Sequence, residues 1–154
     1  MPADFWSRRK KQQIRVKRSW CRILFWKIFD SKNCRATNFK QTTAYIVAFQ
    51  LAMDIFEISK SFPKEETYSL TDQIRRSSRS VCTNLAEAFR KKRYPLHFVA
   101  KVSDSDSENS ETNVWIDFCL ATNYILTTTY DDWASRNEQI GKLLNHMINN
   151  PKKY

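Results

Sequence analysis

Gly141 is the only glycine among the 154 residues of this chain. Soluble proteins contain about 7% glycine, because this residue supplies positive φ angles and allows backbones to approach closely. Two-residue β-hairpin turns, glycine-rich phosphate loops and dinucleotide-binding fingerprints all depend on such positions. Because a single glycine nearly excludes these turns and loops, the sequence predicts an all-α fold. A chain of this length is expected to build one folded domain.

Charge divides the chain into two parts. Residues 1–38 carry 11 basic and 2 acidic side chains, whereas residues 39–154 carry 15 basic and 14 acidic ones. We therefore predict a basic, aromatic N-terminal extension at residues 1–38 and a charge-balanced helical domain at residues 39–150. The extension is either an evolved module or a translated upstream sequence, and the amino-acid sequence leaves both interpretations open.

Apolar residues recur at helical spacing in four segments. The predicted helices span residues 39–61, 70–89, 95–126 and 129–150. Ser-x-x-Asp and Thr-x-x-Asp patterns at residues 69–72 and 129–132 predict the starts of the second and fourth helices. Short connections between four helices favour an up-down-up-down bundle. The polar stretch SDSDSENSE at residues 103–111 is compatible with either helix or linker.

The first predicted helix is apolar over more than one face. One helical face holds Ile46, Phe49, Met53 and Phe56. A second set, Tyr45, Ala48, Ala52 and Ile55, lies beside it. The combined stripe is broader than one packing partner requires. We therefore expect contacts between copies of the chain.

Cysteine usage indicates a reducing compartment. Cys21, Cys34, Cys82 and Cys119 form no C-x-x-C pair and have no neighbouring histidine, so no metal site is predicted. The apolar segment at residues 20–29 contains two basic residues and precedes no small-residue cleavage site, unlike a signal peptide. Ten residues are also too few to span a bilayer. Free thiols in the cytoplasm are the expected state.

Catalytic chemistry has little support in the sequence. His97 and His146 are the only histidines, and both fall near predicted helix ends. Four acids of the third helix admit either a carboxylate metal site or ion pairs with the second helix. The Glu-x-x-His motif of carboxylate-bridged diiron bundles is missing, so we favour ion pairs and expect no enzymatic activity, cofactor or small-molecule substrate. The predicted inter-helix or inter-subunit polar residues are Arg75, Arg76, Arg79, Asn84, Glu87, Asp104, Asp106, Glu108 and Glu111.

Basic residues clustered with aromatic ones favour RNA binding. Phosphate affinity rises with the number of cationic contacts, and Trp6, Trp20, Phe25 and Trp26 are suited to stacking on unpaired bases. A solvated charged surface, or an arm lying on an anionic membrane, are the alternatives. The candidate nucleic-acid-binding residues are Arg8, Arg9, Lys10, Lys11, Arg15, Lys17, Arg18, Arg22, Arg90, Lys91, Lys92 and Arg93.

Motifs in the second and third helices resemble a bacterial family. FPKEETYSLTDQIRR at residues 62–76 and SVCTNLAE at residues 80–87 are similar to signatures of the four-helix-bundle S23 proteins, also called 23S rRNA intervening-sequence proteins. FVAKVSDSDSE at residues 98–108 and WIDF at residues 115–118 resemble the long third helix of that family. The resemblance therefore implies helix through residues 103–111.

The resemblance also implies a left-handed antiparallel bundle, a ring-like homopentamer and an RNA-linked genomic context without established enzymatic activity. Taken with the charge pattern, it leads us to expect a cytoplasmic homo-oligomer that binds structured RNA or a ribonucleoprotein. The alternative is an adaptor ring that binds a protein partner through the charged surface of the second and third helices.

Overall fold

A computed structural model describes residues 38–154 and contains four long helices. These are α3 (Thr43–Ser59), α4 (Leu70–Arg90), α5 (Pro95–Ala121) and α6 (Thr127–Asn149). Three short 3-10 helices accompany them: η1 (Phe39–Gln41), η2 (Lys64–Glu66) and η3 (Pro151–Lys153). The part of the chain that the structure describes contains no β-strand. The predicted all-α fold is confirmed, and residues 103–111 are helical.

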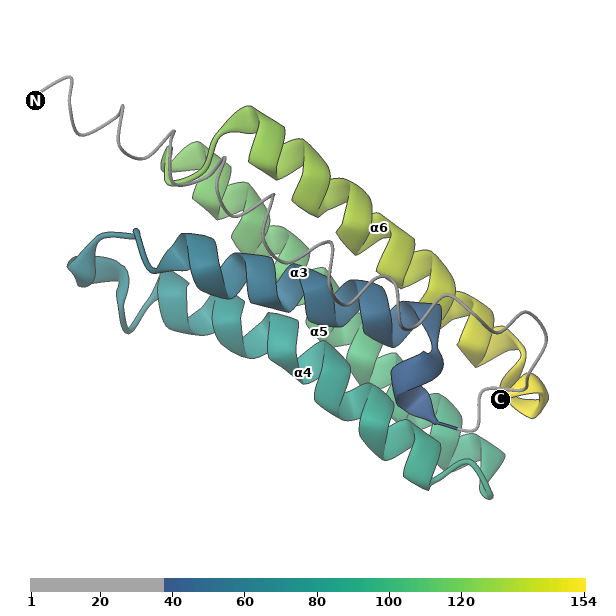
Figure 1. The fold of residues 1–154 in the computed structure, drawn as a ribbon. Coiled ribbons are helices and arrows are strands. Elements are labelled where there is room, and N and C mark those ends of the chain that lie inside the picture. Colours follow the sequence, from purple (N-terminus) through teal and green to yellow (C-terminus); the bar gives the residue numbers. More distant parts are fainter. Residues whose placement is uncertain (1–37) are drawn as a thin grey trace, which may run out of the picture.

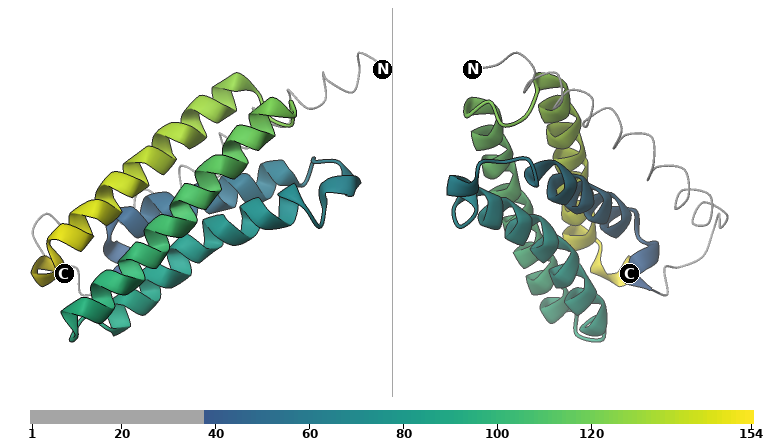
Figure 2. Two further views of the ribbon diagram at one scale, coloured as in Figure 1. Left: turned by 180° about the vertical axis from the view of Figure 1, so that it is seen from behind. Right: turned by 60° about the vertical axis from the view of Figure 1, so that its left-hand side comes forward.

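Successive helices run in opposite directions along the bundle (Figures 1 and 2). α4 packs against α5, α5 packs against α6, and α3 contacts both α4 and α6. This arrangement agrees with the predicted up-down-up-down order, while the left-handedness of the bundle stays a prediction. None of the helices in residues 38–154 has the length and apolar character needed to cross a membrane.

The core follows the apolar stripes that helical spacing predicts on α4, at Leu70, Ile74, Val81, Leu85 and Phe89, and on α6, at Trp133, Ile140, Leu143, Leu144, Met147 and Ile148. Every member of the predicted α4 seam is buried, namely Leu70, Ile74, Val81, Leu85 and Phe89. On α6, Trp133, Ile140, Leu144 and Met147 are buried, whereas Leu143 and Ile148 are half-buried. Helical periodicity alone therefore identified the inner faces of these two helices.

α3 turns a different face inward than its largest side chains suggest. Its buried residues are Ala44, Ala48, Leu51, Ala52, Ile55 and Ser59. The predicted face containing Ile46, Met53 and Phe56 is only half-buried, and Phe49 is exposed. Small residues face the core because they allow α3 to approach its neighbours closely. The larger apolar side chains of α3 lie toward the outside of the helix and toward its border with α4.

α5 ends five residues earlier than predicted, at Ala121. Asn123 adopts a left-handed backbone conformation with φ of 58°. Its N–H donates to the Leu120 carbonyl at 2.9 Å, and the Tyr124 N–H donates to the Cys119 carbonyl at 2.9 Å. This pair of hydrogen bonds is the Schellman motif. It closes the helix without glycine.

The predicted cap of α4 and the predicted start of α6 need correction, although α4 begins at Leu70 as predicted. Ser69 precedes α4 but forms no side-chain capping bond to the helix. Glu66 accepts hydrogen bonds from the Ser69 hydroxyl and, at 3.3 Å, from the Leu70 N–H instead. Thr129 is buried within α6, which begins at Thr127. In both cases a spacing pattern suggested a cap that the chain does not use.

A buried polar layer joins α5 to its neighbours. Asn109 Nδ2 donates to the Asn137 carbonyl at 3.1 Å, and Asn137 Nδ2 donates to the Asn109 carbonyl at 2.9 Å. The Thr112 hydroxyl meets Ser77 Oγ at 3.0 Å, and Ser105 Oγ donates to the Val81 carbonyl at 2.8 Å. Because these buried groups have partners, the layer fixes the register of α4, α5 and α6 without orphaned donors.

Candidate nucleic-acid interface

Three separate segments bring basic side chains to one end of the bundle. The C-terminal segment lies near the turn between α4 and α5 (Figures 1 and 2), and η1 packs against α4 close to this turn. We call the exposed cations of these segments the basic end. It consists of Lys40, Arg90, Lys91, Lys92, Arg93, Lys152 and Lys153.

A chain of aromatic contacts holds these segments together. The Phe39 ring of η1 lies 6.5 Å from the Phe89 ring of α4, centroid to centroid. Phe89 contacts Phe98 of α5 at 6.1 Å, and Phe98 stacks on Tyr154 at 6.4 Å. Aromatic pairs at these separations add to the apolar burial that anchors each segment. The basic end therefore rests on the packed core, and its segments are not loose loops.

The cations of the basic end have no carboxylate partners among residues 38–154. None of the seven forms an ion pair with any residue in the part of the chain that the structure describes. The neighbouring acid Glu87 is bound to Lys101 at 3.0 Å, and Asp104 holds the same ammonium at 3.1 Å. The positive charge is consequently free to act on an external anion.

Sequence reasoning found part of this surface. Arg90, Lys91, Lys92 and Arg93 were predicted as nucleic-acid-binding residues, and the structure places all four at the exposed end of α4 and its turn. Lys40, Lys152 and Lys153 were missed because they lie 50 or more residues from that run along the chain. Only the packing of Tyr154 on Phe98 reveals that the C-terminal pair belongs here.

The other predicted nucleic-acid-binding residues lie in the N-terminal extension, outside the described residues. These are Arg8, Arg9, Lys10, Lys11, Arg15, Lys17, Arg18 and Arg22. The described chain begins at residue 38, next to η1 and hence at the basic end. Any contribution from the extension would therefore start from the same end of the bundle.

The predicted pairing between α4 arginines and α5 acids does not occur within one chain. Arg75 Nε donates to Ser59 Oγ at 2.7 Å, and both Arg75 and Arg79 lie against Phe56 of α3. Arg76 is exposed. These arginines form no ion pair with a described residue, because they face α3 or solvent rather than α5.

The acids of α5 have other surroundings. Asp104 pairs with Lys101, while Glu111 accepts a hydrogen bond from Trp115 Nε1 at 3.0 Å. Burial raises the pKa of Asp106. Glu108 is half-buried beside them, and Asn84 Nδ2 meets Ser80 Oγ at 3.4 Å on α4. Pairing of these acids with arginines of another copy stays a prediction.

The described residues do not bring together a set of reactive groups. Cys82 and Cys119 are free and buried, and burial raises the pKa of each thiol to about 12. Thiols with such pKa values are poor nucleophiles at neutral pH. His97 and His146 are both exposed. Within residues 38–154, no three His, Cys, Asp or Glu side chains are grouped so as to hold a metal ion.

Comparison with known proteins identifies the family. The sequence profile described as 23S rRNA-intervening sequence protein matches residues 40–146. The chain belongs to this family. The match covers α3, α4, α5 and nearly all of α6, including the α4–α5 turn of the basic end. The N-terminal extension and η3 lie outside it.

A solved structure of the same family has a similar fold. It is a protein of unknown function from the S23 ribosomal protein family of Bacteroides thetaiotaomicron, with 25% sequence identity and a TM-score of 0.62. The aligned region covers 69% of this chain and 95% of that chain. No curated protein matches this chain. The sequence profile and the fold therefore agree on the family to which this chain belongs.

Proposed function

We propose that this 23S rRNA-intervening sequence family member is a non-enzymatic, homo-oligomeric bundle that binds structured RNA in the cytoplasm. The observation that carries the proposal is the basic end, where seven exposed cations lie without carboxylate partners among the described residues. Such a surface attracts a phosphate backbone, and each contact releases condensed counterions. The description of the family, which refers to an intervening sequence of 23S rRNA, supports the choice of RNA as the polyanion.

The proposed recognition is by backbone charge and shape. The basic end offers lysine and arginine side chains on a rigid helical base. Phosphate contacts of this kind position a protein on RNA without reading sequence. Folded RNA presents closely spaced phosphates to such a surface. We therefore expect strong salt dependence and modest sequence preference.

A salt titration with a labelled ribosomal RNA stem-loop tests the proposal. Lys91→Gln combined with Lys92→Gln removes two cations of the basic end. If both contact phosphates, the slope of log affinity against log salt falls by about 1.4 to 1.8. Lys64→Gln with Lys142→Gln is the matched control, because both lysines are exposed and belong to other parts of the bundle. This control should retain the slope of the unmodified chain.

The N-terminal extension is tested separately in the full chain. Replacing Arg8, Arg9, Lys10 and Lys11 with glutamine removes four charges without shortening the protein. A lower salt slope would assign RNA contacts to the extension, whereas an unchanged slope would restrict binding to the bundle. Failure of the unmodified chain to bind RNA at low salt would reject RNA binding and direct attention to a protein partner.

Homo-oligomer formation has its own structural support. Val114 and Phe118 of α5 are each 50% exposed, and the Phe118 ring lies 5.7 Å from the half-buried Trp115 ring. Exposed apolar groups gathered on one helix face are typical of protein interfaces. Several basic ends on one assembly would bind a single RNA with higher avidity than one end alone. Mass determination in solution tests this part.

A further inference from the structure

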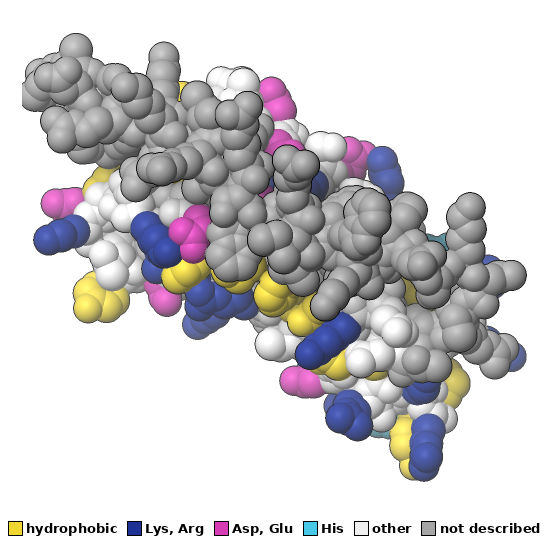
Figure 3. Space-filling view, viewed as in Figure 1, with side chains coloured by type: hydrophobic (Ala, Val, Ile, Leu, Met, Phe, Trp, Pro, Cys, Tyr) yellow, Lys and Arg dark blue, Asp and Glu magenta, His cyan; other side chains and the backbone are white. Residues whose placement is uncertain are grey.

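A second cationic site lies on the side of the bundle, where α3 meets α4. Figure 3 shows Lys and Arg side chains beside hydrophobic ones along these two helices. At the centre is the half-buried Phe56 ring. The guanidinium carbons of Arg75 and Arg79 lie 5.1 and 5.3 Å from the ring centroid, and Lys60 Nζ lies at 4.5 Å. Cations within about 6 Å of an aromatic ring are attracted to its face.

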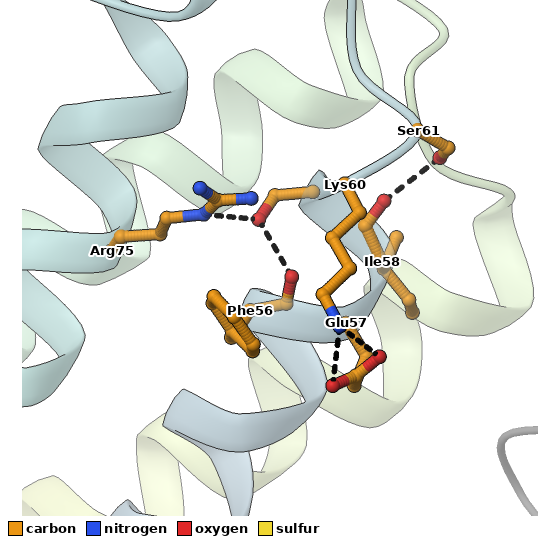
Figure 4. A network of polar contacts seen from close by, with 7 residues as sticks. Phe56, Glu57, Ile58, Lys60, Ser61 and Arg75 are labelled. Carbon is orange, nitrogen blue, oxygen red and sulfur yellow. Dashed lines mark hydrogen bonds and ion pairs between the residues drawn. The ribbon is translucent and has the colours of Figure 1, made fainter.

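Hydrogen bonds fix Arg75 but leave most of its donors unused (Figure 4). Arg75 Nε donates to Ser59 Oγ at 2.7 Å, and the Ser59 hydroxyl in turn donates to the Phe56 carbonyl at 3.1 Å. A guanidinium has five N–H donors. The terminal Nη groups of Arg75 form no hydrogen bond with the described part of the chain.

The neighbouring acids do not neutralise the two arginines. Both carboxylate oxygens of Glu57 are bound by Lys60, at 2.8 and 2.9 Å. Asp72 is exposed and forms no ion pair with a described residue. Burial lowers the pKa of Arg75, the nearby Arg79 charge lowers this pKa further, and Asp72 only opposes these effects. Because Lys60 is paired with Glu57, the two arginines face one exposed acid, and the site keeps a net positive charge.

The spacing of the arginines is unfavourable for the isolated chain. Arg75 and Arg79 are four residues apart on α4, so their side chains are neighbours on one helix face and repel each other. A bound anion would remove this repulsion. Guanidinium groups match phosphate oxygens through paired N–H donors, which a lysine ammonium does not offer.

We propose that Arg75 and Arg79, held against Phe56, bind a backbone phosphate of the same RNA that the basic end binds. This inference rests on the proposed function and extends the RNA path from the end of the bundle along its α3–α4 side. Arg79 and Arg90 are 11 residues apart on α4, which corresponds to about 16 Å along the helix. A folded RNA spans that distance readily. Phe56 acts as a positioning residue, since its ring orients the guanidinium groups.

Substitution of Arg79 tests the site with little risk to the fold, because this side chain is exposed and forms no hydrogen bond with a described residue. Arg79→Gln in the full chain should weaken binding of the labelled ribosomal RNA stem-loop by about tenfold. It should also lower the salt slope by about 1. Lys142→Gln is the control, as it removes one exposed charge from α6.

Phe56→Leu is the companion variant. It keeps every charge, so the salt slope should remain while the affinity falls. Thermal unfolding without RNA separates binding from structure. Arg79→Gln relieves the repulsion with Arg75 but loses the contact with Phe56, and because these small effects oppose each other it should unfold close to the temperature of the unmodified chain.

The outcomes distinguish the two proposals. If the unmodified chain binds RNA and Arg79→Gln behaves like Lys142→Gln, the α3–α4 site is refuted and the basic end is left intact. If Arg79→Gln reduces binding to anionic phospholipid vesicles but leaves RNA binding unchanged, the site serves a membrane and the RNA assignment is wrong. If the unmodified chain binds no RNA, both proposals fail.

Discussion

Gly141 lies inside α6, facing the polar layer of α5. A Cβ atom built at this position would stand 3.4 Å from Asn109 Nδ2 and 3.8 Å from Asp106 Oδ1. Its φ angle is not positive. The only glycine of the chain therefore serves no turn, and a Cβ atom at this position would be in ordinary van der Waals contact with the Asn109 amide.

Alanine at position 141 should stabilise the protein. The added methyl group fits at van der Waals distance, and replacing glycine by alanine inside a helix is worth up to about 1 kcal/mol. Gly141→Ala is expected to raise the urea midpoint without changing the slope of the transition. Gly141→Leu is the contrasting variant, because its longer side chain would displace the amide of Asn109. Equal stability of the two variants would contradict this interpretation of the site.

Residue-level prediction from the sequence was strong for the apolar positions of α4, weaker for those of α3, where Phe49 is exposed, and weakest for buried polar residues. Ile74 and Leu85 follow from helical periodicity, and both are fully buried. Asn109 and Asn137 are also buried, yet asparagine is usually exposed. Their burial depends on each amide finding the other helix's carbonyl, which is a tertiary contact. No local pattern in the sequence carries that information.

At the scale of single helices, the ends were predicted less well than the middles. The third helix was predicted to continue to residue 126, but the chain turns at Asn123. Asparagine tolerates the left-handed conformation better than most residues. Asparagine can therefore end a helix without glycine. An asparagine in the sequence is an ambiguous signal for a helix end, because this residue is also common in loops.

Substitutions at Asn123 should distinguish conformation from side-chain chemistry. Asn123→Ala is expected to lower the free energy of unfolding by about 1 kcal/mol, because a Cβ-bearing residue without a compensating polar group is strained at positive φ. Asn123→Gly should match or exceed the unmodified chain. Urea unfolding monitored by circular dichroism measures both. A destabilised glycine variant would show that the amide, not the backbone angle, is what matters here.

The start of α4 depends on Glu66 of η2. This carboxylate accepts hydrogen bonds from the Ser69 hydroxyl, the Leu70 N–H and, at 3.2 Å, the Tyr124 hydroxyl. The Ser69 bond is the main cause of the lowered pKa of Glu66, and the other two add to it. The same side chain thus joins the start of α4 to the turn after α5.

This lowered pKa predicts how stability depends on pH. Glu66 binds protons more weakly in the folded state than in the unfolded state, where a glutamate titrates near pH 4.3. Its contribution is therefore complete above that pH and is lost as pH falls through the folded-state pKa. Glu66→Gln should be less stable than the unmodified chain at pH 7 and should approach it under acidic conditions.

The control for this experiment is Glu65→Gln, at the exposed neighbouring position. It should leave the pH dependence of stability unchanged. Urea titrations at several pH values provide the comparison. A constant difference between Glu66→Gln and the unmodified chain at every pH would mean that the carboxylate charge is not responsible.

At the scale of the whole molecule, the bundle separates its charges in space. The basic end combines segments that are distant in sequence, and α4 adds arginines toward α3. The outward side of α5 is acidic, with Asp104, Glu111 and Asp117 exposed. The sequence predicted a nearly neutral helical part because it counts charges without placing them. Only the fold shows that basic and acidic side chains gather on different parts of the bundle.

The acidic side of α5 also carries two exposed apolar side chains, Val114 and Phe118, which are suited to contacts between copies of the chain. Val114 and Phe118 lie four residues apart, on the same face of α5. If they form the contact between copies, Val114→Glu combined with Phe118→Glu would place two charges in an apolar interface, where desolvation strongly opposes association. The double variant should then have the mass of one chain, 18.3 kDa. The unmodified protein should have a multiple of it.

Tyr68→Glu with Leu96→Glu is the matched control, since these side chains are apolar and still more exposed, at 92% and 85%. Leu96 lies at the start of α5, at the opposite end of this helix from Val114 and Phe118, and Tyr68 lies outside α5 in the α3–α4 connection. Analytical ultracentrifugation gives the mass, and circular dichroism verifies that each variant remains helical. An assembled α5 variant would place the interface elsewhere, and a single-chain mass for the unmodified protein would reject self-assembly. If only the α5 variant loses assembly and it also binds RNA more weakly, the avidity of the unmodified protein depends on the number of basic ends in the complex.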